Sequence, residues 1–377
     1  MKLKQKITHN LLNIPGWRTK RHIVVIESDD WGSIRMPSRK VYEEFLRKGI
    51  AVDKDPYCRY DSLATADDLS ALFDVLTSVK DRNGHHAVLT ANTVVANPIF
   101  DKIRDSGFRE YYYEPFTETL TKSPIHNGAL ELWKQGMGIE IFYPQFHGRE
   151  HLNVKKWLRT LMSGEEITRI SFNLGTFGLT SAVDTRIKNN YMGAFNSGLK
   201  KDIEEYRKIL TEGLNLFENL FGFRSKSFIA TTYTWPCAIE PTLYENGIKY
   251  LQGLVSQREP IDDDTTFTFR NRNFQGKKNK NGLTYLMRNC FFEPSHFRDY
   301  NDVVGDCLKR IGYAFRWNKA AVISTHRLNY IGSIDENNRK QNLKLLHELL
   351  SSIIKRWPDV EFVNSVQLGD IIRNSIK

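Results

Sequence analysis

The sequence predicts an α/β fold, a parallel (β/α) barrel of about seven or eight strand-plus-helix units that forms a single domain with loop insertions. Strand-like and helix-like segments alternate through the 377 residues, which is the pattern of βα units. No internal repeat or low-complexity linker divides the chain, so residues 1–377 are expected to be one barrel domain. A doubly wound open sheet is the alternative. No glycine-rich phosphate motif follows any expected strand, which argues against a nucleotide enzyme.

Short apolar runs rich in β-branched residues predict the strands. The first is His22–Glu27 (HIVVIE), and polar residues follow it directly. The later expected strands are His86–Ala91, Ile139–Tyr143, Lys226–Thr231, Ile248–Leu251, Leu283–Arg288, Ala320–Thr325 and Val360–Val363.

Amphipathic periodicity predicts helices between these strands. Thr65 or Asp67 is suited to cap one that places Leu69, Leu72 and Leu76 on one face. The other expected helices are Ser38–Lys48, Pro98–Arg104, Pro124–Gln135, Val154–Met162, Lys200–Phe221, Ala238–Asn246, Val303–Trp317, Glu336–Trp357 and one at the C-terminus.

Two segments interrupt the alternation and are expected to be insertions rather than separate domains. The segment 163–198 is irregular and rich in Asn, Thr and Gly. The segment 259–281 carries the densest charge, and we expect an exposed loop or hairpin there with a strand at Thr265–Arg270.

The composition is that of an ordinary soluble globular protein rather than of a nucleic-acid or membrane protein. The net charge of +10 favours acidic partners, but the basic residues are dispersed, so no nucleic-acid partner is expected. Four separated cysteines without a CxxC pair indicate reduced thiols. Because no apolar stretch has the length of a signal peptide or a membrane span, we expect a cytoplasmic protein.

Polar side chains follow three of the apolar runs, where barrels place their chemistry. Asp29 and Asp30 follow the first run, and two neighbouring carboxylates stay ionised only beside a cation. A turn or helix cap is the alternative for this pair. His147 and His151 follow the third strand at i and i+4, which on a helix places both imidazoles on one face. Surface histidines are the alternative. His326 follows the run AVIST and is suited to donate a proton.

Asp29-Asp30, His147-xxx-His151 and His326, in this order, resemble the polysaccharide deacetylase family of carbohydrate esterases, from His22 to about Asn364. The resemblance implies a distorted (β/α) barrel in which Asp30, His147 and His151 hold a divalent metal. It further implies Asp29 as general base and His326 as general acid. Imidazole ligands without thiolates suit zinc, and cobalt, nickel or iron fit almost as well.

The sequence departs from the family pattern in its arginine. The family's Arg-Pro pair after the middle strand has no counterpart in the segment 227–236, and Arg224 lies before that strand. Arg288 is a candidate to supply the missing charge from another strand, the alternative being a structural arginine.

Other site residues are less defined by the pattern. Glu293 and Asp306 are candidates for the carboxylate partner of His326. Trp31 and Trp235 are candidates to stack on a sugar, although packing in the core is the commoner role of tryptophan.

We therefore expect a metal-dependent hydrolase that removes N-acetyl or O-acetyl groups from a polysaccharide or amino-sugar precursor. One alternative is a glycosidase that uses Asp29 with a second carboxylate such as Glu293. A non-catalytic glycan-binding barrel is the other. The sequence leaves the sugar and the oligomeric state open.

Overall fold

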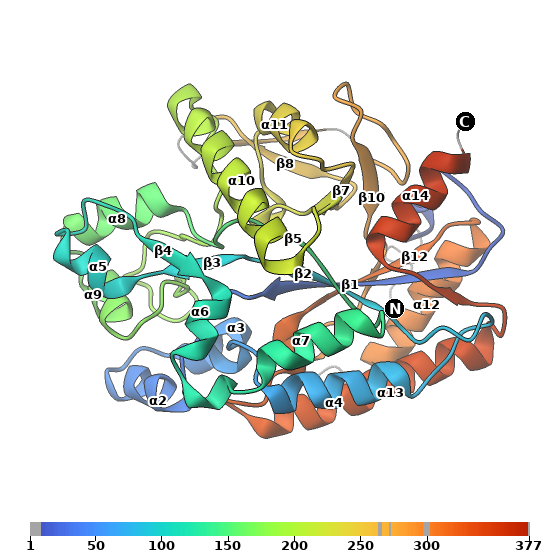
Figure 1. Cartoon of the computed structure of the whole chain (residues 1–377), viewed down its shortest axis with the longest axis horizontal. Coiled ribbons are helices and arrows are strands. Elements are labelled where there is room, and N and C mark those ends of the chain that lie inside the picture. Colours follow the sequence, from blue (N-terminus) through green and yellow to red (C-terminus); the bar gives the residue numbers. More distant parts are fainter. Residues whose placement is uncertain (1–8, 263–265, 271–272, 297–301, 376–377) are drawn as a thin grey trace.

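One curled parallel sheet organises the computed structural model, which describes residues 9–262, 266–270, 273–296 and 302–375 (Figure 1). Its strand order is β10-β7-β6-β5-β2-β1-β12-β11, with β13 paired to β1 as the ninth strand. The strands are β1 (Ile23–Trp31), β2 (Leu89–Thr93), β5 (Phe142–Phe146), β6 (Ser227–Phe228), β7 (Tyr250–Gly253), β10 (Thr284–Met287), β11 (Cys290–Phe291), β12 (Ala321–His326) and β13 (Glu361–Phe362).

The sheet forms a half-barrel, because among the described residues no ladder joins its edge strands β10 and β11. Only Arg288 and Asn289 separate these two strands along the chain. The Arg288 N–H donates to Gly253 on the β7 side, and the Asn289 N–H donates to Val322 on the β12 side. The chain itself therefore crosses the open seam, and Arg288 lies at the crossing.

Alternation along the strands divides the core in two. Val24 and Ile26 of β1 face the outer cluster under α4, α7, α12 and α13. Ile23 and Val25 face the inside of the half-barrel, where Ile372 of α14 joins them. The inner apolar layer ends after Val25, since the next inward position is Glu27.

The predicted helices are present, with shifted ends in several cases. Thr65 caps α4 through a reciprocal capping box with Asp68, and α10 ends at Gly222, whose φ is +75°. The helices are α2 (Arg39–Arg47), α3 (Pro56–Tyr60), α4 (Ala66–Thr77), α5 (Phe100–Asp105), α6 (Phe116–Thr121), α7 (Ala129–Gly138), α8 (Val154–Met162), α9 (Glu166–Asn173), α10 (Lys200–Phe221), α11 (Glu240–Glu245), α12 (Val303–Arg316), α13 (Glu336–Arg356) and α14 (Ser365–Ser375).

The predicted strands β2 and β5 begin and end later than expected, and β6 is shorter. The hairpin of β3 (Ala96–Pro98) and β4 (Tyr113–Pro115) was not predicted. In the segment 259–281, β8 (Gln257–Pro260) pairs with β9 (Phe267–Arg270), while Thr265 and residues 271–272 lie outside the described residues. Figure 1 shows α2, α3, α5, α8 and α9 gathered at one end of the sheet.

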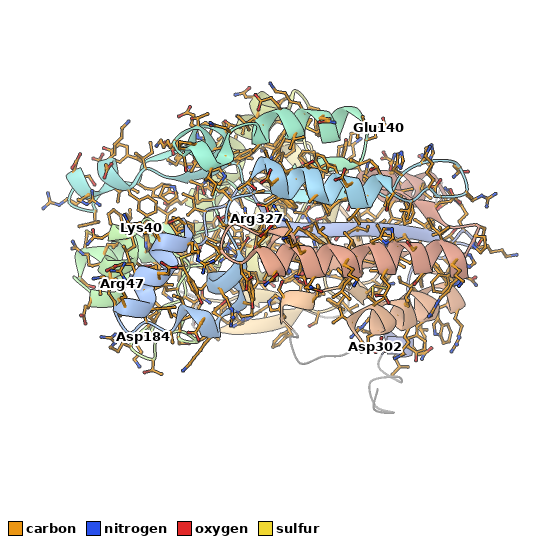
Figure 2. The ribbon with its side chains drawn as sticks, turned by 90° about the horizontal axis from the view of Figure 1, so that it is seen from below. Lys40, Arg47, Glu140, Asp184, Asp302 and Arg327 are labelled. Carbon is orange, nitrogen blue, oxygen red and sulfur yellow. The ribbon has the colours of Figure 1, made fainter. Side chains whose placement is uncertain are left out.

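The charged residues are dispersed, as the sequence indicates. Figure 2 shows Lys40, Arg47, Glu140 and Asp302 toward the outside of the molecule. Arg327, labelled in the same view, is instead one of the buried charged residues, and its side chain donates to Asp61. Within the described ranges, no helix is long and apolar enough to cross a bilayer, and none of the four cysteines forms a disulfide.

Candidate active site

Side chains from three strands meet inside the half-barrel at its carboxyl end. The alternation that points Val25 inward also points Glu27 and Asp29 inward. In the parallel register of β1 and β12, Asp29 of β1 lies opposite His326 of β12. Arg288, the residue after β10, reaches the same place from the seam. All three charged groups thus come from positions fixed by the sheet.

Asp30 points into the site as well because β1 is distorted there. Its φ is +73°, and the register of β1 against β2 shifts between Ser28 and Trp31. Such a left-handed residue in a bulge re-aims a side chain, so two consecutive carboxylates serve one site. The alternation then resumes, and Trp31 turns back into the outer core.

His147 and His151 converge without a helix. They lie in the loop after β5, in which Gly148 has a φ of +121°, so the expected helical arrangement is wrong and the expected proximity is right. The Nδ1 of His147 lies 2.9 Å from the Ile229 carbonyl, which can only accept, so Nδ1 carries the hydrogen. The Nε2 of a neutral His147 therefore presents a bare lone pair to the site.

The donor set fits a divalent metal. The Oδ1 of Asp30 lies 3.4 Å from His147 Nε2 and 3.2 Å from His151 Nε2, and one ligand atom from each residue lies within 4.8 Å of the others. His147 Nε2 is buried and has no hydrogen-bond partner. Burial lowers the pKa of His151 to about 4, so this imidazole is neutral near pH 7. A buried carboxylate oxygen within 3.4 Å of two imidazole nitrogens is the donor set of a metal site.

Arg35 holds the other oxygen of Asp30. Its Nη2 donates to Oδ2 at 2.9 Å, while its Nη1 lies 3.1 Å from the sulfur of Met192. Burial alone would raise the pKa of Asp30, but the charge of Arg35 and the contacts with His151 and His147 hold that pKa well below its usual value. Asp30 is thus an ionised ligand whose free oxygen is directed at the histidines.

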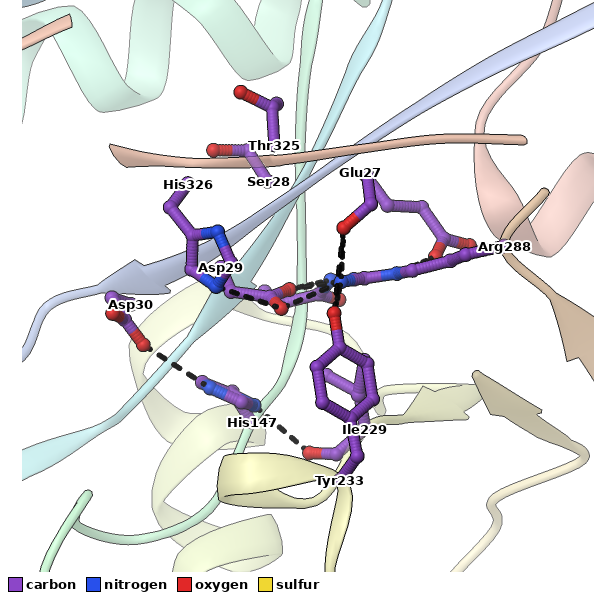
Figure 3. Close-up of polar contacts among 12 residues, drawn as sticks. Glu27, Ser28, Asp29, Asp30, His147, Ile229, Tyr233, Arg288, Thr325 and His326 are labelled. Atoms are coloured by element: carbon purple, nitrogen blue, oxygen red, sulfur yellow. Dashed lines mark hydrogen bonds and ion pairs between the residues drawn. The ribbon is translucent and has the colours of Figure 1, made fainter. Parts of the chain in front are cut away.

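Arg288 binds Asp29 with both of its terminal nitrogens (Figure 3). Nη2 donates to Oδ1 at 2.6 Å and Nη1 to Oδ2 at 2.7 Å, while Nε donates to Glu27 at 2.7 Å. Burial would raise the pKa of Asp29, but the Arg288 charge and hydrogen bonds outweigh it and hold the pKa at about 2. The charge missing from the family's usual position is therefore present beside Asp29, from a different strand.

His326 lies between two carboxylates. Its Nδ1 is 2.6 Å from Glu293 Oε1, and its Nε2 is 3.8 Å from Asp29 Oδ2. Burial would lower the pKa of His326, but the charge and hydrogen bond of Glu293, together with Asp29, raise it to about 9. The imidazole is accordingly protonated near pH 7. Of the two candidate partners, Glu293 is the one in contact, while Asp306 pairs with Lys309 on α12.

The tryptophan expectations are wrong. Trp31 is 1% exposed, donates to Ser28 and packs edge-on against Phe142 in the core. Trp235 is equally buried and donates to Glu240. Neither indole can stack on a sugar, because both side chains pack in the core, which is the commoner role of tryptophan.

Several site residues were missed from the sequence. Asn92 donates to Asp29 Oδ1 at 2.7 Å, and its place at the end of an apolar run was an available signal. The hydroxyl of Tyr233 accepts from Arg288 Nη1 at 2.7 Å. Thr232 and Tyr233 both have φ values of +56°, so a left-handed turn directs this ring. No local sequence pattern predicts that turn, and none predicts that Arg35 belongs to the site.

The site opens into a cavity of about 310 Å³. Its wall includes the candidate ligands and catalytic groups. The remaining lining comes from Arg35, Asp55, Tyr57, Gly178, Thr180, Asn190, Met192, Ala230, Thr232 and Tyr233.

No protein-family model matches the chain, and no curated protein matches its sequence. Solved structures are similar over nearly the full length. A Mycobacterium smegmatis protein assigned as a polysaccharide deacetylase has 11% identity, a TM-score of 0.42, and coverage of 96% of this chain and 93% of that chain.

The peptidoglycan deacetylase PdaC from Bacillus subtilis has 10% identity, a TM-score of 0.32, and coverage of 94% and 93%, respectively. The 4-alpha-glucanotransferase from Thermococcus litoralis has 9% identity, a TM-score of 0.46, and coverage of 92% of this chain and 40% of that chain. The likeness is distant, so the roles of the site residues depend on their own geometry.

Proposed function

We propose that the protein is a metal-dependent hydrolase that removes N-acetyl or O-acetyl groups from a polysaccharide or an amino-sugar precursor. The observation that carries this proposal is the buried group of Asp30, His147 and His151, with Asp29 and His326 on the same cavity. The carbohydrate comes from the resemblance of the sequence motifs to polysaccharide deacetylases.

Asp30, His147 and His151 would hold the metal. A divalent cation there supplies Lewis acidity, which lowers the pKa of a water and polarises an acyl carbonyl. Zinc is the metal we expect first, since the ligands are two imidazoles and one carboxylate.

The remaining groups handle protons. Asp29, held ionised by Arg288, accepts a proton from the attacking water. His326, protonated through its pair with Glu293, donates one to the departing amine nitrogen. Asp29 Oδ2 and His326 Nε2 lie 3.8 Å apart, which supports a role for both groups on one small substrate. Arg288 and Glu293 orient the two groups.

The alternatives are less well supported. A glycosidase would need Glu293 free to attack or protonate a glycosidic bond, but this carboxylate contacts His326 and Asn329. The missing arginine motif was the reason to consider a non-catalytic barrel. Because Arg288 lies beside Asp29, that reason no longer applies. The cytoplasmic location stays a prediction.

Acetate release tests the proposal. Protein loaded with zinc, cobalt, nickel or iron is incubated with N-acetylated sugars, and the expected result is metal-dependent release. Asp29→Asn and His326→Ala should abolish it, while His347→Ala, an exposed histidine on α13, should not. If all variants have the same residual rate, or one metal per chain fails to bind, the proposal is refuted.

A further inference from the structure

One irregular segment, residues 174–196, covers the carboxyl end of the half-barrel beside the site. We call it the cover segment. It contains no helix or strand, yet apolar side chains anchor it along its length. Phe177, Leu179, Val183, Ile187 and Tyr191 are each at most 5% exposed and pack into two clusters with α8, α9 and α2. Such packing fixes a segment that has no ladder of its own.

The cover segment is attached on both sides of the cavity. On one side, the Thr180 hydroxyl donates to Asp55 Oδ2 at 3.1 Å, and Ala51 N–H donates to the Val183 carbonyl at 3.1 Å. On the other side, the Ala194 N–H donates to Thr231 Oγ1 at 2.9 Å. The Asn153 N–H donates to the Tyr191 carbonyl at 2.7 Å, close to the histidine loop. The segment therefore spans the cavity from one rim to the other.

The middle of the segment forms a wall of the cavity. Gly178, Thr180, Asn190 and Met192 line it together with the candidate metal ligands. Met192 also contacts Arg35, which holds Asp30, so the wall directly adjoins the ligand set. Asp30 is 2% exposed, His147 2% and His151 4%. These ligands therefore lie at the buried end of the cavity that the segment bounds.

The size of this cavity limits what enters. About 310 Å³ lies at the lower end of small-molecule pockets, enough for roughly one sugar residue with its acyl group. A polymer deacetylated along its length needs a groove that is open on both sides of the reacting residue. Here the cover segment forms a wall of the cavity, and we infer that this wall blocks one such side.

We propose that the site accepts a single N-acyl amino sugar, either free or at a chain end, and excludes internal residues of a polymer. The cover segment determines this selectivity through Thr180, Asn190 and Met192. This inference rests on the proposed function, because it assigns the substrate class of that hydrolase.

The test compares N-acetylglucosamine and its linear oligomers of increasing length with metal-loaded enzyme, and locates each released acetyl group by mass spectrometry. We expect acetate to come only from a terminal residue, with kcat/KM that does not increase with chain length. In Asn190→Ala/Met192→Ala, the ratio of kcat/KM for the hexamer to that for the monomer should rise roughly tenfold. If the double variant fails to fold, Asn190→Ala alone is the substitute, because the Asn190 side chain is exposed. It should shift the ratio in the same direction.

Thr185→Ala is the matched control, since Thr185 is exposed on the same segment and does not line the cavity. It should leave the ratio unchanged. Deacetylation of internal residues, or a rate that increases with length, overturns the inference. Loss of all sugar activity also overturns it, while metal-dependent hydrolysis of a simple acetyl ester would then show that the hydrolase itself stands.

Discussion

Replacing Arg288 by methionine should destabilise the protein strongly and change the pH dependence of its stability. The Arg288 side chain is fully buried and binds the buried carboxylates of Glu27 and Asp29. Methionine fills much of the space but leaves both carboxylates unpaired. Breaking a buried ion pair in this way costs about 3–5 kcal/mol, a large part of a typical stability of 5–15 kcal/mol, as an order of magnitude.

The pH dependence distinguishes lost charge pairing from lost packing. In the wild type, the pKa of Asp29 is lowered from 3.8 to about 2, so the stabilisation is present above pH 3.8 and is lost as the pH falls through about 2. Without Arg288, burial raises the pKa of Asp29, so the carboxylate takes up a proton more readily. The loss of stability in Arg288→Met should therefore be largest near pH 7 and shrink toward pH 4.

Urea unfolding at a series of pH values measures both effects. Arg39→Met is the control, because Arg39 is exposed and pairs with the exposed Glu43, so its loss should cost no more than about 1 kcal/mol. Adding Glu27→Gln to Arg288→Met should restore part of the stability. A cost for Arg288→Met that is below 1 kcal/mol, or that is the same at pH 7 and pH 4, would refute the reasoning.

Three further predictions concern the acid, the metal and the N-terminal segment. Because Glu293 raises the pKa of His326 from 6.5 to about 9, the pair's contribution to stability should be complete below pH 6.5 and be lost as the pH rises through about 9. Activity should fall over the same alkaline range, because the acid loses its proton there. Glu293→Gln should move this limb of the kcat/KM profile to lower pH, and an unmoved limb contradicts the assignment. His151→Ala should weaken metal binding by more than roughly 100-fold in a chelator competition, and wild-type affinity would exclude it as a ligand. Lys319 is 2% exposed, and its ammonium donates to the carbonyls of residues 15–17. Lys319→Met should therefore lower the free energy of unfolding in urea by about 2–4 kcal/mol. A decrease of less than about 1 kcal/mol contradicts this prediction.

The alternation of strands and helices was readable from the sequence because each run carries its own period. The alternation along the first strand, for example, defines two faces of the sheet without any tertiary information. Val24 and Ile26 lie on one face, and Ile23 and Val25 on the other. Helix ends with a cap, such as Thr65 and Gly222, were also placed correctly. The ends of β2 and β5 were missed because polar and proline residues continue these strands into the site, where burial is not signalled by apolarity.

Many site residues were predictable because they lie at or just after strand ends, but the geometry that joins them was predictable only in part. Asp29 and His326 are such residues, and the sheet brings them together by register. Asp30 depends on a left-handed φ, and His147 and His151 depend on a loop rather than the expected helix. Tyr233 and the pair of Arg288 with Asp29 depend on distances across the half-barrel, which no local pattern records.

The crossing of the seam at Arg288 also bears on how such proteins diverge. Inward positions at the carboxyl ends of neighbouring strands converge on one small volume, so a guanidinium delivered from any of them meets the same carboxylate. Selection can then preserve a function while its residue migrates between strands, and a search that demands the arginine at one fixed motif would discard working descendants as inactive.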